Sequence, residues 1–188
     1  MEIVKSPATL DDLYAAPNEG TCELVNGELV FMSPTGFSPA RVATNIVVAL
    51  HAYERVRGEG LALADGIAYV VNLHNRRSSS PDASYTLVVP PPERKMKFID
   101  GAPIFAAEVR SEYEHDYGPQ ADRAYADKRR DYFAAGTSVV WDVDPVAERV
   151  RSYRHDRPDS LTVFHVGEMA EAAPALPGWT VAVADLFA

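Results

Sequence analysis

The chain has 188 residues, of which 47% are hydrophobic and 24% charged, and its formal net charge is −9. This composition excludes an intrinsically disordered chain, and the length predicts one folded domain over residues 1–188. The acidic charge counts against a protein that coats nucleic acid through a broad basic surface, because such binding depends on neutralised phosphates. A nuclease stays open, since clustered active-site carboxylates add negative charge while arginines can line a local groove.

The sequence shows no export or membrane signal. Its first 17 residues contain no apolar signal-peptide core, and no apolar run approaches the roughly 18 to 20 residues that span a bilayer. Cys22 is the single cysteine, which excludes an intramolecular disulfide and a cysteine-rich zinc site. We therefore expect a cytoplasmic protein with no membrane partner.

The first third of the chain predicts a helix, a β-hairpin and a second helix. Thr9 has the pattern of a helix N-cap. Asn26-Gly27 lies between two apolar runs and favours the positive φ angles of a type I′ hairpin turn. Ser38 and Pro39 open an amphipathic segment in which apolar residues recur at helical spacing. The predicted elements are a helix at 10–15, a hairpin at 22–31 and a helix at about 39–56.

The remaining chain is rich in strands, with one further helix. Strands in runs with few helices favour an α+β or α/β fold, here a mixed β-sheet flanked by helices. The apolar tail at 175–187 is expected to pack on the body of the protein. The predicted elements are strands at 66–73 and 82–89 around a polar loop at 75–81, a strand at 104–111, a helix at 119–135 ended by Gly136, and strands at 137–143, 148–155 and 161–166.

Glu108 is the first candidate for chemistry. The period of a strand places Phe105, Ala107 and Val109 on one face, and Glu108 on the other face with Ala106 and Arg110. A carboxylate within this apolar segment needs a partner or a metal ion, because an unpaired buried charge is costly. The alternative is an ion pair between Glu108 and Arg110 on a solvated face.

Lys128 is the second candidate. On a helix, Ala121, Tyr125, Lys128 and Tyr132 fall within one stripe of about 60°, so the lysine shares the face expected to pack inward. The alternative is a lysine whose stem lies along the apolar edge while its ammonium group reaches solvent.

Asp82 begins an apolar strand directly after Pro81 and could equally be a turn residue. Together with Glu108 and Lys128, however, it fits one reaction. Two carboxylates can hold a hard divalent ion such as Mg²⁺, the ion lowers the pKa of a bound water, and a lysine orients that water or stabilises phosphate charge. We predict that the three side chains converge in one cleft, with at least one raised carboxylate pKa.

The chain resembles the Uma-type restriction endonucleases, a family formerly classed as a domain of unknown function, with the PD-(D/E)xK nuclease fold. The resemblance covers nearly the whole chain. It is carried by Thr9-Leu10-Asp11-Asp12-Leu13, Glu23-Leu24-Val25-Asn26-Gly27-Glu28-Leu29, Ser33-Pro34-Thr35-Gly36, Pro81-Asp82, Glu108-Val109-Arg110-Ser111, the segment from Lys128 to Gly136, the segment from Val140 to Pro145, and Leu176-Pro177-Gly178-Trp179.

The resemblance implies a metal-dependent endonuclease that hydrolyses DNA with Mg²⁺ or Mn²⁺. Asp82 and Glu108 would be the motif acids and metal ligands, together with the backbone carbonyl of Val109. Lys128 would be the catalytic lysine, moved from the strand position that Arg110 occupies, and Glu23 would be an additional active-site carboxylate. The alternative for Glu23 is a solvated strand residue.

The sequence leaves several points open. Family members often carry His-Gln soon after the Ser-Pro-x-Gly turn, where this chain has Pro39-Ala40, so no polar residue is expected to act there.

A catalytically silent nuclease fold that serves as an interaction module is the alternative to an enzyme. A zinc hydrolase fits less well, because the five histidines show no HExxH or paired ligand spacing: His51, His74, His115, His155 and His165. A homodimer is compatible with the sequence.

Overall fold

The computed structural model describes residues 6–17, 21–111 and 117–188. Its centre is a six-stranded sheet in the order β11-β10-β9-β8-β6-β3. The β8 and β9 strands are parallel, whereas the other neighbouring pairs are antiparallel, so the predicted mixed sheet is confirmed. The strands are β3 (Leu61–Ala64), β6 (Ala83–Thr86), β8 (Phe105–Val109), β9 (Val139–Asp144), β10 (Arg149–Arg154) and β11 (Arg157–His165).

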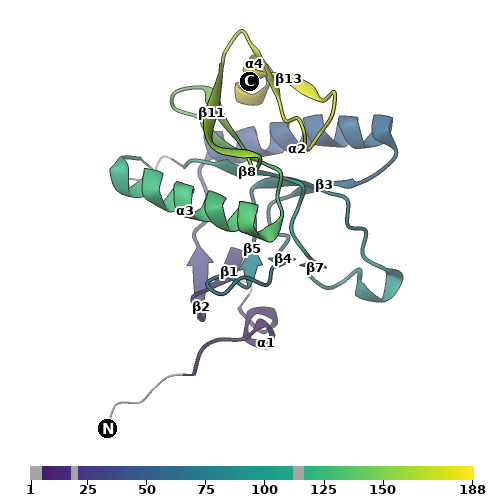
Figure 1. Ribbon diagram of the computed structural model, residues 1–188, viewed down its shortest axis with the longest axis vertical. Coiled ribbons are helices and arrows are strands. Elements are labelled where there is room, and N and C mark those ends of the chain that lie inside the picture. The colour runs from purple at the N-terminus through teal and green to yellow at the C-terminus, as the bar shows by residue number, and fades with distance from the viewer. Residues whose placement is uncertain (1–5, 18–20, 112–116) are drawn as a thin grey trace.

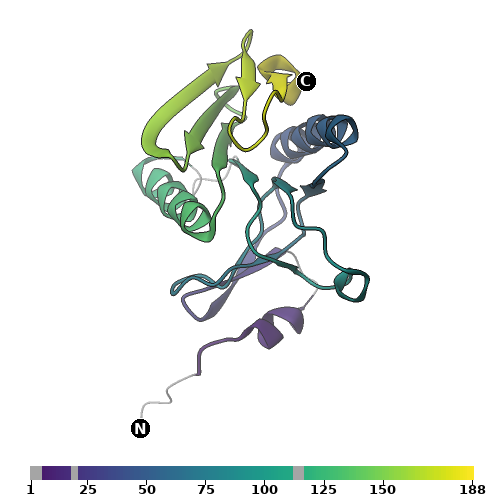
Figure 2. The ribbon, with the colours of Figure 1, turned by 45° about the vertical axis from the view of Figure 1, so that its right-hand side comes forward.

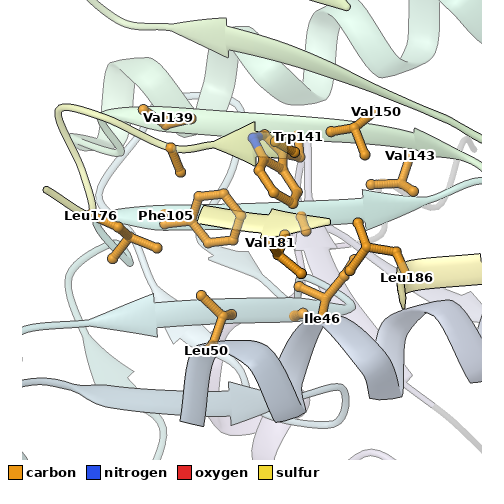
Figure 3. Packing of buried hydrophobic residues seen from close by; sticks show 14 of the residues in the cluster. Ile46, Leu50, Phe105, Val139, Trp141, Val143, Val150, Leu176, Val181 and Leu186 are labelled. Atoms are coloured by element: carbon orange, nitrogen blue, oxygen red, sulfur yellow. The ribbon is translucent and has the colours of Figure 1, made fainter. Parts of the chain in front are cut away.

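Two long helices lie on opposite sides of this sheet, α2 (Phe37–Arg57) on one and α3 (Pro119–Ala135) on the other (Figures 1 and 2). The α2 side holds the larger core, in which Ile46 and Leu50 pack toward Phe105 and Trp141 (Figure 3). The α3 side holds a smaller apolar cluster, made of Ala106, Tyr132, Phe133 and Val140. The predicted mixed sheet flanked by helices is therefore confirmed.

The C-terminal tail covers the larger core. It forms β12 (Met169–Glu171), β13 (Thr180–Ala182) and the short helix α4 (Val183–Phe187). Leu176, Trp179 and Leu186 are buried in the cluster, so the expected packing of the tail on the body is confirmed.

Two small sheets lie beside the main one. The hairpin of β1 (Thr21–Val25) and β2 (Glu28–Met32) follows α1 (Leu10–Tyr14), and a three-stranded sheet joins β5 (Ser78–Ser79), β4 (Tyr69–Val70) and β7 (Ile99–Asp100). A 3₁₀ turn, η1 (Pro92–Arg94), precedes β7. The Ser78 hydroxyl accepts a hydrogen bond from the Leu24 amide at 2.8 Å, and so joins the hairpin to β5.

Local sequence signals correctly predicted the ends and turns of several elements. Thr9 and Asp12 form a capping box at α1, and Asn26 and Gly27 have the positive φ angles that a type I′ turn requires. Gly136 ends α3 in the left-handed conformation. In the described residues 6–17, 21–111 and 117–188, no helix is long and apolar enough to cross a membrane.

Other expected elements are wrong in extent. The strand predicted at 66–73 is reduced to the two residues of β4, because the chain turns back there to pair with β5. The polar loop predicted at 75–81 contains β5, and three of its serines, Ser78, Ser79 and Ser80, are buried. The α2 helix begins two residues before Pro39, with Gly36 and not Ser38 at its N-cap.

The outer strands also differ from the predictions. The predicted strand at 82–89 ends at Thr86, and the apolar residues after it, Leu87, Val88 and Val89, are exposed. The β3 and β12 strands were not predicted, and β11 begins four residues before its predicted start at 161.

Candidate active site

The candidate site lies where β6, β8 and α3 meet. Glu108 is on β8, on the face that packs against α3. Ala83, the first residue of β6, pairs with Ala107, so Asp82, directly before the strand, lies beside the Glu108 end of β8. The Val109 amide donates a hydrogen bond to Asp82 Oδ2 at 2.6 Å. The sheet register thus brings these two acids together from segments 26 residues apart in the sequence.

Glu108 is 7% exposed and both of its carboxylate oxygens accept hydrogen bonds. The Lys128 ammonium donates to Oε2 at 2.8 Å, and the Tyr132 hydroxyl donates to Oε1 at 2.6 Å. Burial raises the pKa of Glu108 to about 7, with a smaller contribution from the charges of Asp82 and Glu23, although Lys128 acts in the opposite direction. The expected raised carboxylate pKa is present, but desolvation exceeds like-charge repulsion as its cause.

Lys128 points inward from α3. Its ammonium lies 2.8 Å from Glu108 Oε2 and 3.3 Å from Glu23 Oε1, and its side chain is 19% exposed. Burial would lower the pKa of Lys128, but the charges of Glu108 and Glu23 outweigh burial and raise it. Lys128 therefore stays cationic at physiological pH, and the alternative of an ammonium directed to solvent is wrong.

Glu23 reaches the same cluster from β1, so the alternative of a solvated strand residue is wrong. It is 4% exposed and pairs with Arg76 and Lys128. The Ser80 amide also donates to Glu23 Oε1 at 2.8 Å. Burial opposes ionisation of Glu23, but Lys128 and Arg76 outweigh it and lower its pKa. Two buried carboxylates thus share one lysine, and only Glu108 has a raised pKa.

A cavity of about 200 Å³ opens beside Asp82 and Val109. Its far wall is formed by α2, where small side chains such as Ala40 and Ala43 leave space. The residues that line it in the described chain include Asp65 and Asp82 but no lysine or arginine. The acidic lining disfavours an anionic ligand, and a cation that accompanied the ligand would offset this charge.

Asp82 and Glu108 provide two carboxylates, the hard oxygen donors that Mg²⁺ prefers. Within residues 6–17, 21–111 and 117–188, no group of three or more His, Cys, Asp or Glu side chains is arranged to hold a metal ion. Mg²⁺, however, is usually bound through one or two carboxylates and keeps several waters. His115 lies outside the described residues.

Arg110 does not pair with Glu108, as one alternative from the sequence proposed, but with acids of β9 and α3. Its guanidinium makes two hydrogen bonds to Asp142 on β9, each of 2.7 Å, and an ion pair with Asp122 on α3. Arg110 is 3% exposed. The hypothesis of an ion pair between Glu108 and Arg110 on a solvated face is wrong, because both side chains are buried against α3 and have other partners.

Sequence reasoning missed two members of the cluster. Arg76 lies in the segment expected to be a polar loop, yet it is buried and bridges Glu23 and Asp131. Nothing in its sequence context distinguishes it from the exposed Arg77. Tyr132 was placed on the inward stripe of α3 only as a packing residue, and that stripe was the signal that its hydroxyl could reach Glu108.

Comparison with known proteins identifies the family of this chain. The family model Uma2, described as "Putative restriction endonuclease", matches residues 7–184. The chain belongs to the Uma2 family. No curated protein matches the chain. The resemblance found in the sequence is thereby confirmed at the level of the Uma2 family.

A solved structure related to the Uma2 fold matches nearly the whole chain. It is described as a "putative nuclease belonging to DUF820" from Anabaena variabilis. The TM-score is 0.73 at 19% identity, and the match covers 96% of this chain and 98% of that one. At this identity the match shows a shared fold, so residue roles in this Uma2 member depend on its own site.

Proposed function

We propose that this chain is an endonuclease that hydrolyses phosphodiester bonds of DNA with a divalent metal ion, Mg²⁺ or Mn²⁺. The observation that carries the proposal is the buried Glu108 carboxylate, held by Lys128 at 2.8 Å next to Asp82. Membership of a family described as "Putative restriction endonuclease" supports it. Two acids can hold a divalent ion, and a lysine can stabilise charge on an anionic ester while it is hydrolysed.

Asp82, Glu108 and the Val109 carbonyl would hold the ion. These are hard oxygen donors, and a set of this size leaves room for waters and a substrate phosphate oxygen. When bound, a divalent ion lowers the pKa of a coordinated water and neutralises charge on the phosphate. Glu108 must be ionised to act as a ligand, so its proton and the cation compete for the same carboxylate.

Lys128 would act as an electrostatic group. Its raised pKa keeps it protonated, so it cannot serve as a general base near neutral pH. The Lys128 ammonium lies next to Glu108 Oε2. From this position it could donate a hydrogen bond to the attacking water or to a phosphate oxygen on which negative charge develops. Glu23 would keep this ammonium in place, because it is ionised and lies 3.3 Å away.

The cavity beside Asp82 offers a path for the substrate. Lys128 and Tyr132 cover Glu108 from the α3 side, whereas the cavity borders Asp82 and Val109 from the α2 side. A phosphate that entered there would meet Asp82 and Val109 without displacing α3, whereas the Glu108 carboxylate faces α3. The acidic lining of the cavity disfavours this entry, and the metal ion would offset that charge.

One observation favours the alternative, a catalytically silent interaction module. The carboxylate oxygens of Glu23 and Glu108 already accept hydrogen bonds or ion pairs from Lys128, Arg76, Tyr132 and the Ser80 amide. In a silent module these contacts would be permanent and would serve stability alone. In an enzyme, at least the pair between Lys128 and Glu108 must rearrange when a cation binds.

The test is cleavage of supercoiled, linear and single-stranded DNA by the pure protein, with Mg²⁺, with Mn²⁺ and with EDTA. We expect metal-dependent cleavage. Glu108→Gln and Lys128→Met should each lower the rate on the order of 100-fold or more, because each removes a group that stabilises the transition state. Arg130→Met is the control, since Arg130 is an exposed α3 residue paired only within its helix among the contacts described. Cleavage that persists at wild-type rates in Glu108→Gln, or no cleavage of any substrate, would contradict the proposal.

A further inference from the structure

Arg110 connects two strands and a helix next to the proposed catalytic groups. It follows Glu108 by two residues, directly after the end of β8, and its side chain reaches α3 as that of Glu108 does. Its guanidinium forms a two-pronged pair with Asp142, which lies directly opposite Glu108 on β9. Both side chains are almost fully buried, so this pair is rigid and strongly directional.

The same guanidinium also holds the beginning of α3. It lies 2.8 Å from Asp122 Oδ1 in the first turn of the helix, and it stacks over the ring of Tyr125 at 4.5 Å from the centroid. Tyr125 and Lys128 are three residues apart, so they lie on the same face of α3. Arg110 therefore contacts the helix one turn before the lysine that reaches Glu108.

Apolar packing alone does not fix this half of α3. The buried apolar residues of the helix are Ala121 near its start and Tyr132 and Phe133 near its end. The end is also held by the pair between Arg76 and Asp131. Between these ends the helix has only partly buried or exposed side chains, and the polar contacts of Arg110 and Lys128 join it to the sheet.

We propose that Arg110 is a positioning residue: by holding Asp122 and Tyr125 against β8 and β9, it fixes α3 where the Lys128 ammonium meets Glu108. The inference rests on the proposed function only for its catalytic consequence. The placement of Lys128 can be measured without any activity.

The neighbouring Arg151 provides a comparison, because it pairs with acids of β9. It pairs with the same Asp142 at 3.3 Å and with Asp144 at 3.4 Å, both on β9. Neither of these two ion pairs reaches α3. Loss of a contact to Asp142 can therefore be separated from loss of the contact to α3.

The test uses Asp122→Ala, because replacing Arg110 itself would leave Asp142 buried beside one fewer cation and could prevent folding. Asp122 is 61% exposed, so the variant removes the α3 contact and leaves the buried pair with Asp142. Asp127→Ala is the matched control: it removes another exposed acid of α3, whose partner Arg130 lies on the same helix.

The direct readout is ¹⁵N NMR of the lysine side chains. The chain has four lysine ammonium groups, at Lys5, Lys95, Lys97 and Lys128. Lys128→Arg assigns the signal. We expect exchange of the Lys128 ammonium protons with water to become faster on the order of tenfold in Asp122→Ala, as expected when one charge-assisted contact is lost, and to stay unchanged in Asp127→Ala. Equal exchange in both variants would overturn the proposal.

The second readout is kinetic. Asp122→Ala should lower kcat with little change in KM, and it should cause no further loss in a Lys128→Met background, because a residue that acts through Lys128 has no effect once that lysine is gone. Losses that multiply would overturn the proposal. If the wild type cleaves nothing, the proposed function fails, and the NMR comparison alone decides the role of Arg110.

Discussion

At the scale of single residues, the site is defined by how its carboxylates differ. Glu23 has a lowered pKa because Lys128 and Arg76 outweigh its burial. Glu108 is also buried, but one shared lysine and two neighbouring acids leave it with a pKa of about 7. Of the two, Glu108 is the carboxylate that a further cation would stabilise most.

This difference predicts a pH dependence of stability. Because the folded pKa of Glu108, about 7, lies above its ordinary value of 4.5, the folded state binds a proton more tightly than the unfolded chain. The stability that this proton contributes is present below about pH 4.5 and is lost as the pH rises through about 7. Relative to Glu108→Gln, the wild type should lose about 3 kcal/mol of unfolding free energy across this window.

Chemical denaturation of both proteins at several pH values without metal measures this difference. Comparison with the variant removes the contributions of the other titrating groups. A difference that stays constant between pH 4.5 and pH 8 would mean that Glu108 is ionised throughout this range, and the competition between proton and cation would then be absent.

At the scale of elements, the sequence predicted what periodicity and capping encode. Helix α3 and strand β8 were predicted together with their inward faces from the periodicity of their residues. Lys128 and Glu108 stood out because they are charged residues on those faces. Strand β5 was not predicted, because its residues lie in the segment predicted as a polar loop. Ser78, Ser79 and Ser80 are buried there, and a run of serines has the composition of an exposed loop.

This segment could not be predicted from the sequence because its burial depends on tertiary contacts. Arg76 is buried because Glu23 on β1 and Asp131 on α3 both pair with it, and neither partner is near it in the sequence. Composition cannot reveal such a contact. The presence of Glu23 in the cluster could be expected only from the family resemblance, whereas its partner Arg76 could not be expected at all.

Arg76 therefore joins three elements, and its loss should be costly. Arg76→Met removes the cation from two carboxylates that are mostly buried, and breaking a buried pair in this way typically costs about 3 to 5 kcal/mol. Since Lys128 remains beside Glu23, we expect a loss near 3 kcal/mol in the unfolding free energy. Urea denaturation measures it.

The adjacent Arg77→Met is the control, because Arg77 is exposed and should change stability by about 0.5 kcal/mol or less. Similar small effects of both variants would show that Arg76 does not hold the hairpin and α3 together.

At the scale of the whole molecule, the sheet places the candidate site between two different environments. The α2 side carries the large apolar core and the cavity beside Asp82, whereas the α3 side carries the network of charged residues around Glu108, Glu23 and Arg110. The net charge of −9 opposes the approach of a nucleic-acid backbone, and a divalent ion at the site would offset part of that charge. The proposed function places this ion at Asp82 and Glu108.

The measurement that tests this claim most directly is thermal unfolding of the wild type and Glu108→Gln across a titration with Mg²⁺ and Mn²⁺. An ion that binds only the folded state stabilises it by about 2.7 kcal/mol at 100 times its dissociation constant, which for a chain of this size raises Tm by roughly 5 to 10 °C. We predict this rise in the wild type and in a Glu28→Gln control, whose replaced side chain is exposed on β2, and its loss in Glu108→Gln. Equal responses of all three proteins would contradict a metal site at Glu108.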